Sequence, residues 1–128
     1  MDNEMRRWLQ YAETDLGVAK HLAESYYPRP TEIICYHCQQ AAEKALKALW
    51  FRTGIRESLP KTHNLSFLLQ QIKNAVPIPP ICYDKADLLT PYGIAARYPN
   101  ELYIEDRHVA AAIESAEYLL HWVKDQIR

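Results

Sequence analysis

The chain has 128 residues, of which 48% are hydrophobic and 24% are charged, and its formal net charge is −1. This composition excludes a disordered chain, which would carry fewer apolar residues and a larger net charge. The length fits one domain over residues 1–128. The charge balance argues against a domain that binds nucleic acid mainly by neutralising phosphates.

The sequence predicts a cytoplasmic protein without a membrane segment. No apolar run approaches the roughly 18 residues that span a bilayer. The charged N-terminus leads straight into patterned sequence, so no signal peptide is expected. Three cysteines, an odd number, fit a reducing compartment better than a set of disulfides.

Proline placement divides the chain into five predicted helices. Seven of the eight prolines fall in four short stretches, and proline disrupts helix interiors, so these stretches are expected to link helices. The helices are expected over about residues 3–26, 31–53, a short one from 64, 81–97 and 105–128. Thr31 is the expected N-cap of the second helix and Gly54 its expected stop. Pro91 and Gly93 predict a kink or break in the fourth.

Apolar residues recur in these segments at steps of three and four. The first stripe consists of Met5, Trp8, Ala12, Leu16, Ala19, Ala23 and Tyr26, and the last of Val109, Ile113, Ala116, Leu120, Val123 and Ile127. No segment alternates with period two, so no sheet is predicted. The expected fold is an all-α, antiparallel up-and-down bundle of about five helices, a four-helix core plus one short helix. The stripes and three tryptophans carry more apolar surface than a small bundle readily buries, which predicts a homodimer.

Four passages resemble the HEPN family, small helical domains found beside minimal nucleotidyltransferases. They are Trp-Leu-Gln-Tyr-Ala-Glu-Thr-Asp-Leu at residues 8–16, Cys-Tyr-His-Cys-Gln-Gln-Ala-Ala-Glu-Lys-Ala-Leu-Lys-Ala-Leu at 35–49, Lys-Thr-His-Asn-Leu at 61–65 and Ala-Arg-Tyr-Pro at 96–99. Their order and spacing match the family over nearly the whole chain. The resemblance implies a bundle that pairs as a homodimer. It also implies either a metal-independent RNase, often a toxin, or a nucleotidyltransferase partner that binds a nucleotide.

The sequence departs from the RNase pattern, which the family builds from an arginine and a histidine four to six residues apart. Arg97 occupies the arginine position, but five places on stands Leu102, and the next histidine is His108. Attack by a ribose 2′-hydroxyl needs a proton acceptor of near-neutral pKa and a cation for the developing charge. Because leucine accepts no proton, an RNase would have to use Arg97 with the displaced His108. RNase activity is therefore the alternative function.

Asp15 interrupts the apolar stripe of the first helix, so its carboxylate is expected to face at least partly inward. A buried carboxylate needs a partner, and His37, Lys44 and Arg97 are the candidates. An internal ion pair that fixes helix register and a role in binding are both open.

One face of the second predicted helix carries Gln40, Glu43, Lys44 and Lys47 at helical spacing. A solvated face and a binding face are both open for this set. Of the four, Lys44 is the candidate for contact with a phosphate.

Lys61 and His63 precede the third predicted helix, where free N–H groups and the helix dipole favour an anion such as phosphate. The alternative is that Thr62 or Asn64 caps this helix and His63 packs locally. Arg97 closes the fourth predicted helix beside Tyr98.

An arginine with an adjacent aromatic suits a phosphate and a stacked base, and it also suits a packed helix end with a carboxylate partner. An antiparallel arrangement would bring Lys61, His63 and Arg97 near one pocket. Tyr98 could then stack on the base of a bound nucleotide.

Cys35 and Cys38 share the apolar stripe of the second helix, where cysteines are usually part of the core. No second pair of metal ligands lies nearby in the sequence, and no glycine-rich phosphate loop is present. We therefore expect neither a metal nor another cofactor.

The leading hypothesis is a HEPN-like binding or regulatory module that partners a minimal nucleotidyltransferase, as in toxin–antitoxin systems. It would contact a nucleotide or RNA through Lys44, Lys61, His63, Arg97 and Tyr98. The alternatives are the RNase described above and a purely structural dimer.

Overall fold

The computed structural model of the protein describes residues 3–55, 57–93 and 103–128. In these residues the chain forms five α-helices and one short 3₁₀ helix, with no strand. They are α1 (Asn3–Ser25), α2 (Thr31–Arg52), α3 (Leu65–Ile72), α4 (Pro80–Leu89), η1 (Thr90–Gly93) and α5 (Asp106–Ile127). The all-α prediction is confirmed, and the break expected at Pro91 and Gly93 falls in η1.

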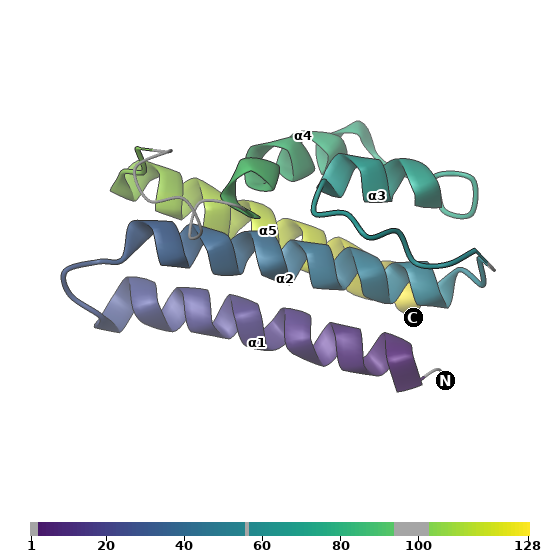
Figure 1. The fold of residues 1–128 in the computed structure, drawn as a ribbon, viewed down its shortest axis with the longest axis horizontal. Helices are drawn as coiled ribbons and strands as arrows, with labels where there is room; N and C mark the ends of the chain where they lie inside the picture. The colour runs from purple at the N-terminus through teal and green to yellow at the C-terminus, as the bar shows by residue number, and fades with distance from the viewer. Residues whose placement is uncertain (1–2, 56, 94–102) are drawn as a thin grey trace.

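The three long helices form the body of the bundle, and the short α3 and α4 pack beside α2 and α5 (Figure 1). α1 is antiparallel to both α2 and α5 (Figure 1). Ion pairs Lys20–Glu117 and Glu13–Lys124 join α1 to α5. α2 and α3 point the same way, because the link between them runs back along the bundle before α3 begins (Figure 1).

α2 lies at the centre of the molecule and is buried around most of its circumference. Small side chains allow its close approach to α1, and Ala12, Ala19, Ala41 and Ala45 are all fully buried. Larger side chains fill the other faces of α2, among them the fully buried Leu46. The interior therefore forms around one helix that contacts all the others.

The apolar stripes predicted from the sequence are largely buried within the single chain. Leu16, Val109 and Val123 belong to the core, whereas Tyr26 is 60% exposed because it follows the last residue of α1. The stripes thus supply the interior of the monomer. Any dimer has to use the apolar residues that this interior leaves at the surface, such as Tyr26.

The helix ends follow local rules with one exception. Gly54 follows Thr53, the C-cap of α2, and adopts a φ of 76°, the left-handed conformation that ends many helices. Asn64 caps α3 by accepting the Phe67 N–H at 3.0 Å. The prediction that Thr31 caps α2 is wrong. The carbonyl of Pro30 already accepts the Ile34 N–H at 3.0 Å, so Pro30 is the N-cap, one residue earlier than expected, and α2 has no side-chain cap.

None of the helices in the described ranges is both long enough and apolar enough to cross a membrane.

Candidate functional site

Two buried carboxylates on α1 and α2 are each held by one lysine and one histidine. Together with two glutamines they form what we call the charged cluster. It comprises Asp15, His37, Gln39, Gln40, Glu43, Lys44, Lys47 and His63. Most of these residues stand on α2, and the α2–α3 link supplies His63.

Asp15 forms the first half of the cluster. Its residue is only 9% exposed, and its Oδ1 lies 2.9 Å from His37 Nδ1. Its Oδ2 accepts a hydrogen bond from Lys44 Nζ at 2.5 Å. The carboxylate therefore faces inward, as its place in the sequence indicated, and α2 supplies both partners.

Glu43 forms the second half, and its side chain is 4% exposed. Its Oε1 lies 2.8 Å from His63 Nδ1 and accepts from Gln39 Nε2 at 3.0 Å, while its Oε2 accepts from Lys47 Nζ at 2.8 Å. Burial acts to raise the pKa of Glu43, but the hydrogen bonds from Lys47, Gln39 and His63 outweigh it and hold the pKa below its ordinary value. Glu43 is therefore ionised at neutral pH although it is buried.

This depressed pKa makes the stability of the fold depend on acid pH. A carboxyl whose pKa is lower in the folded than in the unfolded chain stabilises the fold above its ordinary pKa, 4.5, and loses that contribution as the pH falls through the folded value. We expect the parent protein to be more stable than Glu43→Gln at neutral pH. The difference in the free energy of unfolding between the two proteins should become smaller below about pH 4.5.

Urea titrations of the two proteins across this pH range measure the effect. Subtracting the Glu43→Gln curve from the parent curve removes the contribution of the other carboxylates. A difference in the free energy of unfolding that stays constant with pH would contradict the lowered pKa of Glu43.

Aromatic residues of α1 cover both lysines of the cluster. Lys44 Nζ lies 6.0 Å from the centre of the Tyr11 ring, and Lys47 Nζ lies 5.3 Å from the centre of the Trp8 ring. Trp8, Tyr11 and Asp15 share one face of α1, at i, i+3 and i+7. Each ammonium group is thus held between an aromatic ring and a carboxylate, which fixes its position and satisfies its charge.

The cluster contains as many carboxylates as ammonium groups. The carboxylates of Asp15 and Glu43 are paired with the ammonium groups of Lys44 and Lys47. The face of α2 that the sequence left open is therefore neither a simple solvated face nor a free cationic patch. Lys44, a candidate for phosphate contact, has its charge committed to Asp15.

Lys61 and His63 point into different surroundings. His63 is turned toward Glu43. Lys61 lines a shallow hollow of about 420 Å³ together with Pro60, Thr62, Asn64 and the 42% exposed ring of Phe67. Lys61 makes no hydrogen bond or ion pair to any residue that the structure describes. Of the candidate cations in the described ranges, Lys61 is the one whose charge is available to a ligand.

The start of α3 offers fewer free donors than its sequence suggested. The Phe67 N–H is bonded to the side chain of Asn64, and the Leu65 N–H donates to Thr90 Oγ1 at 3.2 Å. The Thr62 hydroxyl accepts from the Asn64 N–H at 3.1 Å. Local capping by Asn64, the alternative for this stretch, is therefore present. A ligand in the hollow would depend on side chains more than on the helix terminus.

Arg97, Tyr98 and Leu102 lie outside the described residues. The last described residue before them is Gly93, and a Cβ at that position would lie 3.1 Å from Gln39 Cδ. The absence of a side chain lets η1 pack against Gln39, whose Nε2 also donates to the His63 carbonyl at 3.1 Å. η1 therefore ends beside the charged cluster.

His108 has a structural role at the start of α5. Its Nδ1 accepts the backbone N–H of Glu105 at 2.9 Å, in a capping box that begins the helix. The hydrogen bond engages one of the two ring nitrogens and fixes the ring against its own helix. The histidine that an RNase mechanism would need is thus part of a helix cap.

The three cysteines are buried and free. Burial raises the pKa of Cys35 to about 12, raises that of Cys82 to about 11, and raises that of Cys38 further still. They are protonated thiols at neutral pH, whereas metal ligation and nucleophilic attack both use the thiolate. Within the described ranges, no three side chains of His, Cys, Asp or Glu come together as a metal site.

Sequence reasoning missed three residues of this region. Gln39 was named only as part of the passage that resembles the family, yet it is fully buried and joins Glu43 to the α2–α3 link. Gly93 was read only as a helix breaker. Phe67 lies in an apolar helix start in which Leu65, Leu68 and Leu69 are buried, so its 42% exposure had no signal in the sequence.

The fold and the cluster define a small, all-helical protein with a buried charged cluster between α1 and α2. The sequence profile described as the HEPN domain matches residues 5–126. The chain belongs to the HEPN family, and the resemblance seen in the sequence is confirmed.

Solved structures show the same fold. ST0689, an archaeal HEPN homologue, is 30% identical over 100% of both chains, with a TM-score of 0.77. TT1696 from Thermus thermophilus is 27% identical over 97% of this chain and 98% of its own, with a TM-score of 0.82. A HEPN domain protein from Thermotoga maritima shares the fold at 23% identity over 94% of this chain and 97% of its own, with a TM-score of 0.70. No curated protein matches the chain.

Proposed function

We propose that this HEPN domain is a homodimeric binding or regulatory module that partners a minimal nucleotidyltransferase and contacts a nucleotide or RNA, in a system of the toxin–antitoxin kind. The observation that supports a binding role over an RNase role is the placement of His108. Its ring is held in the capping box of α5, and the RNase position five residues after Arg97 is a leucine. A module whose His108 is committed to a helix cap is better suited to binding than to cleavage.

The contact with a nucleotide is best supported at the hollow beside α3. Lys61 has no partner among the described residues and offers its ammonium group to a phosphate, and the exposed ring of Phe67 offers a surface on which a base can stack. Asn64 uses its side-chain oxygen to cap α3, which leaves its amide N–H groups available as donors. Arg97 and Tyr98 remain proposed contributors to the same contact.

Replacing Lys61 with alanine should weaken the binding of AMP by about tenfold, because one charge-assisted contact is removed. Fluorescence competition or calorimetry at low and high salt measures this, and the affinity of the parent should fall as salt rises. Lys73→Ala, which removes an exposed lysine at the far end of α3, is the matched control. Equal affinities for the Lys61 and Lys73 variants would remove the hollow as the contact site.

The nucleotidyltransferase partner is tested by co-expression with the minimal nucleotidyltransferase encoded in the same genome. A complex that survives purification by a tag on either chain is the expected result. Failure to co-purify from both tags would contradict the partnership, and it would leave the AMP measurement unaffected.

The RNase alternative makes an opposite prediction. We expect the pure protein to cleave single-stranded RNA no faster than His108→Ala, and its expression alone to leave host growth unchanged. His108→Ala should instead lower the free energy of unfolding by about 1 kcal/mol, because it removes half of the capping box. Robust metal-independent cleavage that disappears in both Arg97→Ala and His108→Ala would establish the RNase.

A further inference from the structure

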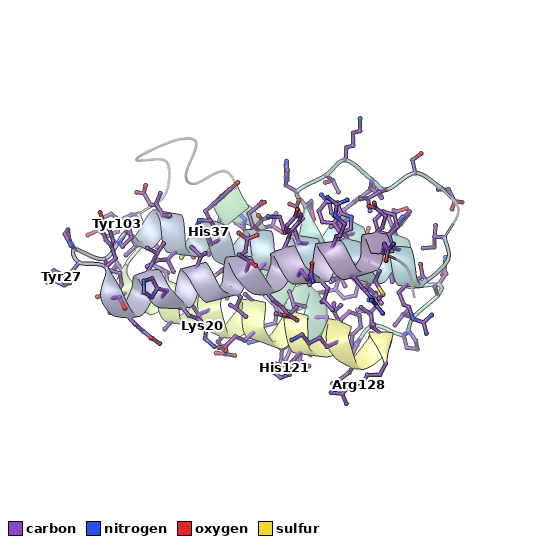
Figure 2. All side chains as sticks on the ribbon, turned by 90° about the horizontal axis from the view of Figure 1, so that it is seen from below. Lys20, Tyr27, His37, Tyr103, His121 and Arg128 are labelled. Atoms are coloured by element: carbon purple, nitrogen blue, oxygen red, sulfur yellow. The ribbon has the colours of Figure 1, made fainter. Side chains whose placement is uncertain are left out.

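Three tyrosines stand exposed at the end of the bundle where α1 turns into α2 and α5 begins. Tyr27 is 92% exposed, Tyr103 88% and Tyr26 60%. Figure 2 shows Tyr27 and Tyr103 at the same end of the molecule. The two segments are tied by an ion pair between Arg29 and Asp106 at 3.0 Å. Tyrosine is enriched at protein interfaces, where its large amphipathic ring becomes buried.

Beside these tyrosines lies a hollow of about 290 Å³ between the end of α1 and the start of α5. Its lining includes the apolar side chains of Ala23, Val109, Ala110 and Ile113. A tyrosine side chain is smaller than this volume. The same end of the molecule thus carries projecting aromatic rings and, next to them, an apolar recess that can receive one.

The charges around the recess are mixed. Lys20 and Arg29 contribute positive charge, and Glu24 and Asp106 contribute negative charge. Such a rim has no net positive field to attract a nucleic acid. Within the chain, Arg29 already pairs with Asp106 and Lys20 with Glu117, so the rim presents a polar, nearly neutral border to a second copy.

We infer that this end of the bundle is the surface through which two copies of the chain associate, with Tyr27 of each copy entering the α1–α5 recess of the other. A two-fold axis completes both contacts at once, because projection and recess lie on the same patch. The inference rests on the homodimer of the proposed function and adds to it the surface that forms the dimer.

The available area is consistent with a stable pair. Each buried aromatic side chain removes about 150–250 Å² from solvent, so the three tyrosines supply more than half of the roughly 800 Å² that each partner of a standard interface buries. The apolar recess and its rim add to this area. The chain's net charge of −1 leaves little repulsion between copies.

The test measures the mass of the full chain in solution by light scattering and sedimentation over a range of concentrations. The parent is expected to be a dimer. The double variant Tyr27→Ala with Tyr103→Ala should weaken dimerisation by at least about 30-fold, because each tyrosine is an anchor. Phe67→Ala, which removes an exposed aromatic on α3, is the matched control and should remain dimeric. Circular dichroism and thermal melting of every variant show that the monomers are folded.

A complementation experiment distinguishes this surface from any other. Ala110 is exposed and lines the recess, so Ala110→Trp should fill it and make the protein monomeric. Tyr27→Ala alone should also weaken the dimer. Mixed together, the two variants should form a heterodimer, because Tyr27 of the Ala110→Trp chain can enter the open recess of the Tyr27→Ala chain.

Several outcomes would overturn the inference. A monomeric parent across the concentration range removes the homodimer itself. A parent dimer that the tyrosine and Ala110 variants leave unchanged keeps the homodimer and removes this surface. Assemblies larger than a dimer that need Tyr27 would replace the two-fold contact with a head-to-tail one. Binding of a single-stranded RNA that needs Tyr27 in a monomeric parent would assign the tyrosines to nucleic acid.

Discussion

Replacing Glu43 with alanine is expected to lower the free energy of unfolding by about 3–5 kcal/mol, because it leaves a buried ammonium group without its counter-ion. The side chain of Lys47 is only 11% exposed and the side chain of Glu43 only 4%. Removing the carboxylate also deprives Gln39 of an acceptor inside the core and His63 of its only side-chain partner in the described structure. Unfolding in urea, followed by circular dichroism, measures the loss.

Glu117→Ala is the matched control for this substitution. Glu117 pairs with Lys20 at 2.6 Å, but both side chains are well exposed, and an exposed ion pair contributes about 0–1 kcal/mol. Glu43→Gln should fall between the two, since it keeps an acceptor and removes the charge. If Glu43→Ala were no more harmful than Glu117→Ala, the cluster would not be the buried, ionised network described above.

Replacing Leu46 with alanine should also lower the free energy of unfolding strongly, by about 2–5 kcal/mol. Leu46 is fully buried on α2, the helix that contacts all the others, so neighbouring side chains have little freedom to move into the vacated space. The substitution removes both the buried apolar surface and the packing contacts around it. Thermal unfolding should show a midpoint lower by roughly 10 °C or more.

Leu88→Ala provides the control for the same chemistry at the surface. Leu88 lies on α4 and is 38% exposed, so its truncation should lower stability by less than about 1 kcal/mol. Comparable losses for the two variants would indicate that α2 is not the centre of the core.

Much of the fold could be predicted from local sequence. The proline stretches mark the links, and the helices begin and end within one or two residues of the expected places, except that α4 ends at Leu89 whereas the fourth helix was expected to run to about residue 97. Gly54 and Asn64 end and start their helices through conformations and side-chain bonds that involve only near neighbours. Thr31 was misjudged because the choice between it and Pro30 as the N-cap of α2 depends on a single backbone hydrogen bond, from the Ile34 N–H to the Pro30 carbonyl.

The candidate site could be predicted only in part. The place of Asp15 in the apolar stripe pointed to burial, and His37 and Lys44 were among its possible partners. The burial of Glu43 was not foreseen, because the α2 face that carries it is polar in sequence. The α2–α3 link covers Glu43 through His63, which is 20 residues away in the sequence. η1 covers the neighbouring Gln39 through Gly93.

The sequence likewise could not show which of the candidate lysines is available to a ligand. Lys44 and Lys61 look equivalent as phosphate ligands, yet one is neutralised by Asp15, 29 residues distant, and the other faces an open hollow. The ion pair between Arg29 and Asp106 likewise joins residues that lie far apart in the sequence.

The amino-acid sequence alone was sufficient for the all-helical class, most of the helix boundaries and membership of the HEPN family. These follow from periodicity, proline placement and short motifs, which are properties of neighbouring residues. Only the tertiary structure decided which polar side chains are paired, which carboxylate is buried and ionised, and which aromatic rings remain at the surface. Those properties depend on contacts between residues far apart in the chain, and a helical stripe shows which way a side chain points without showing what will cover it.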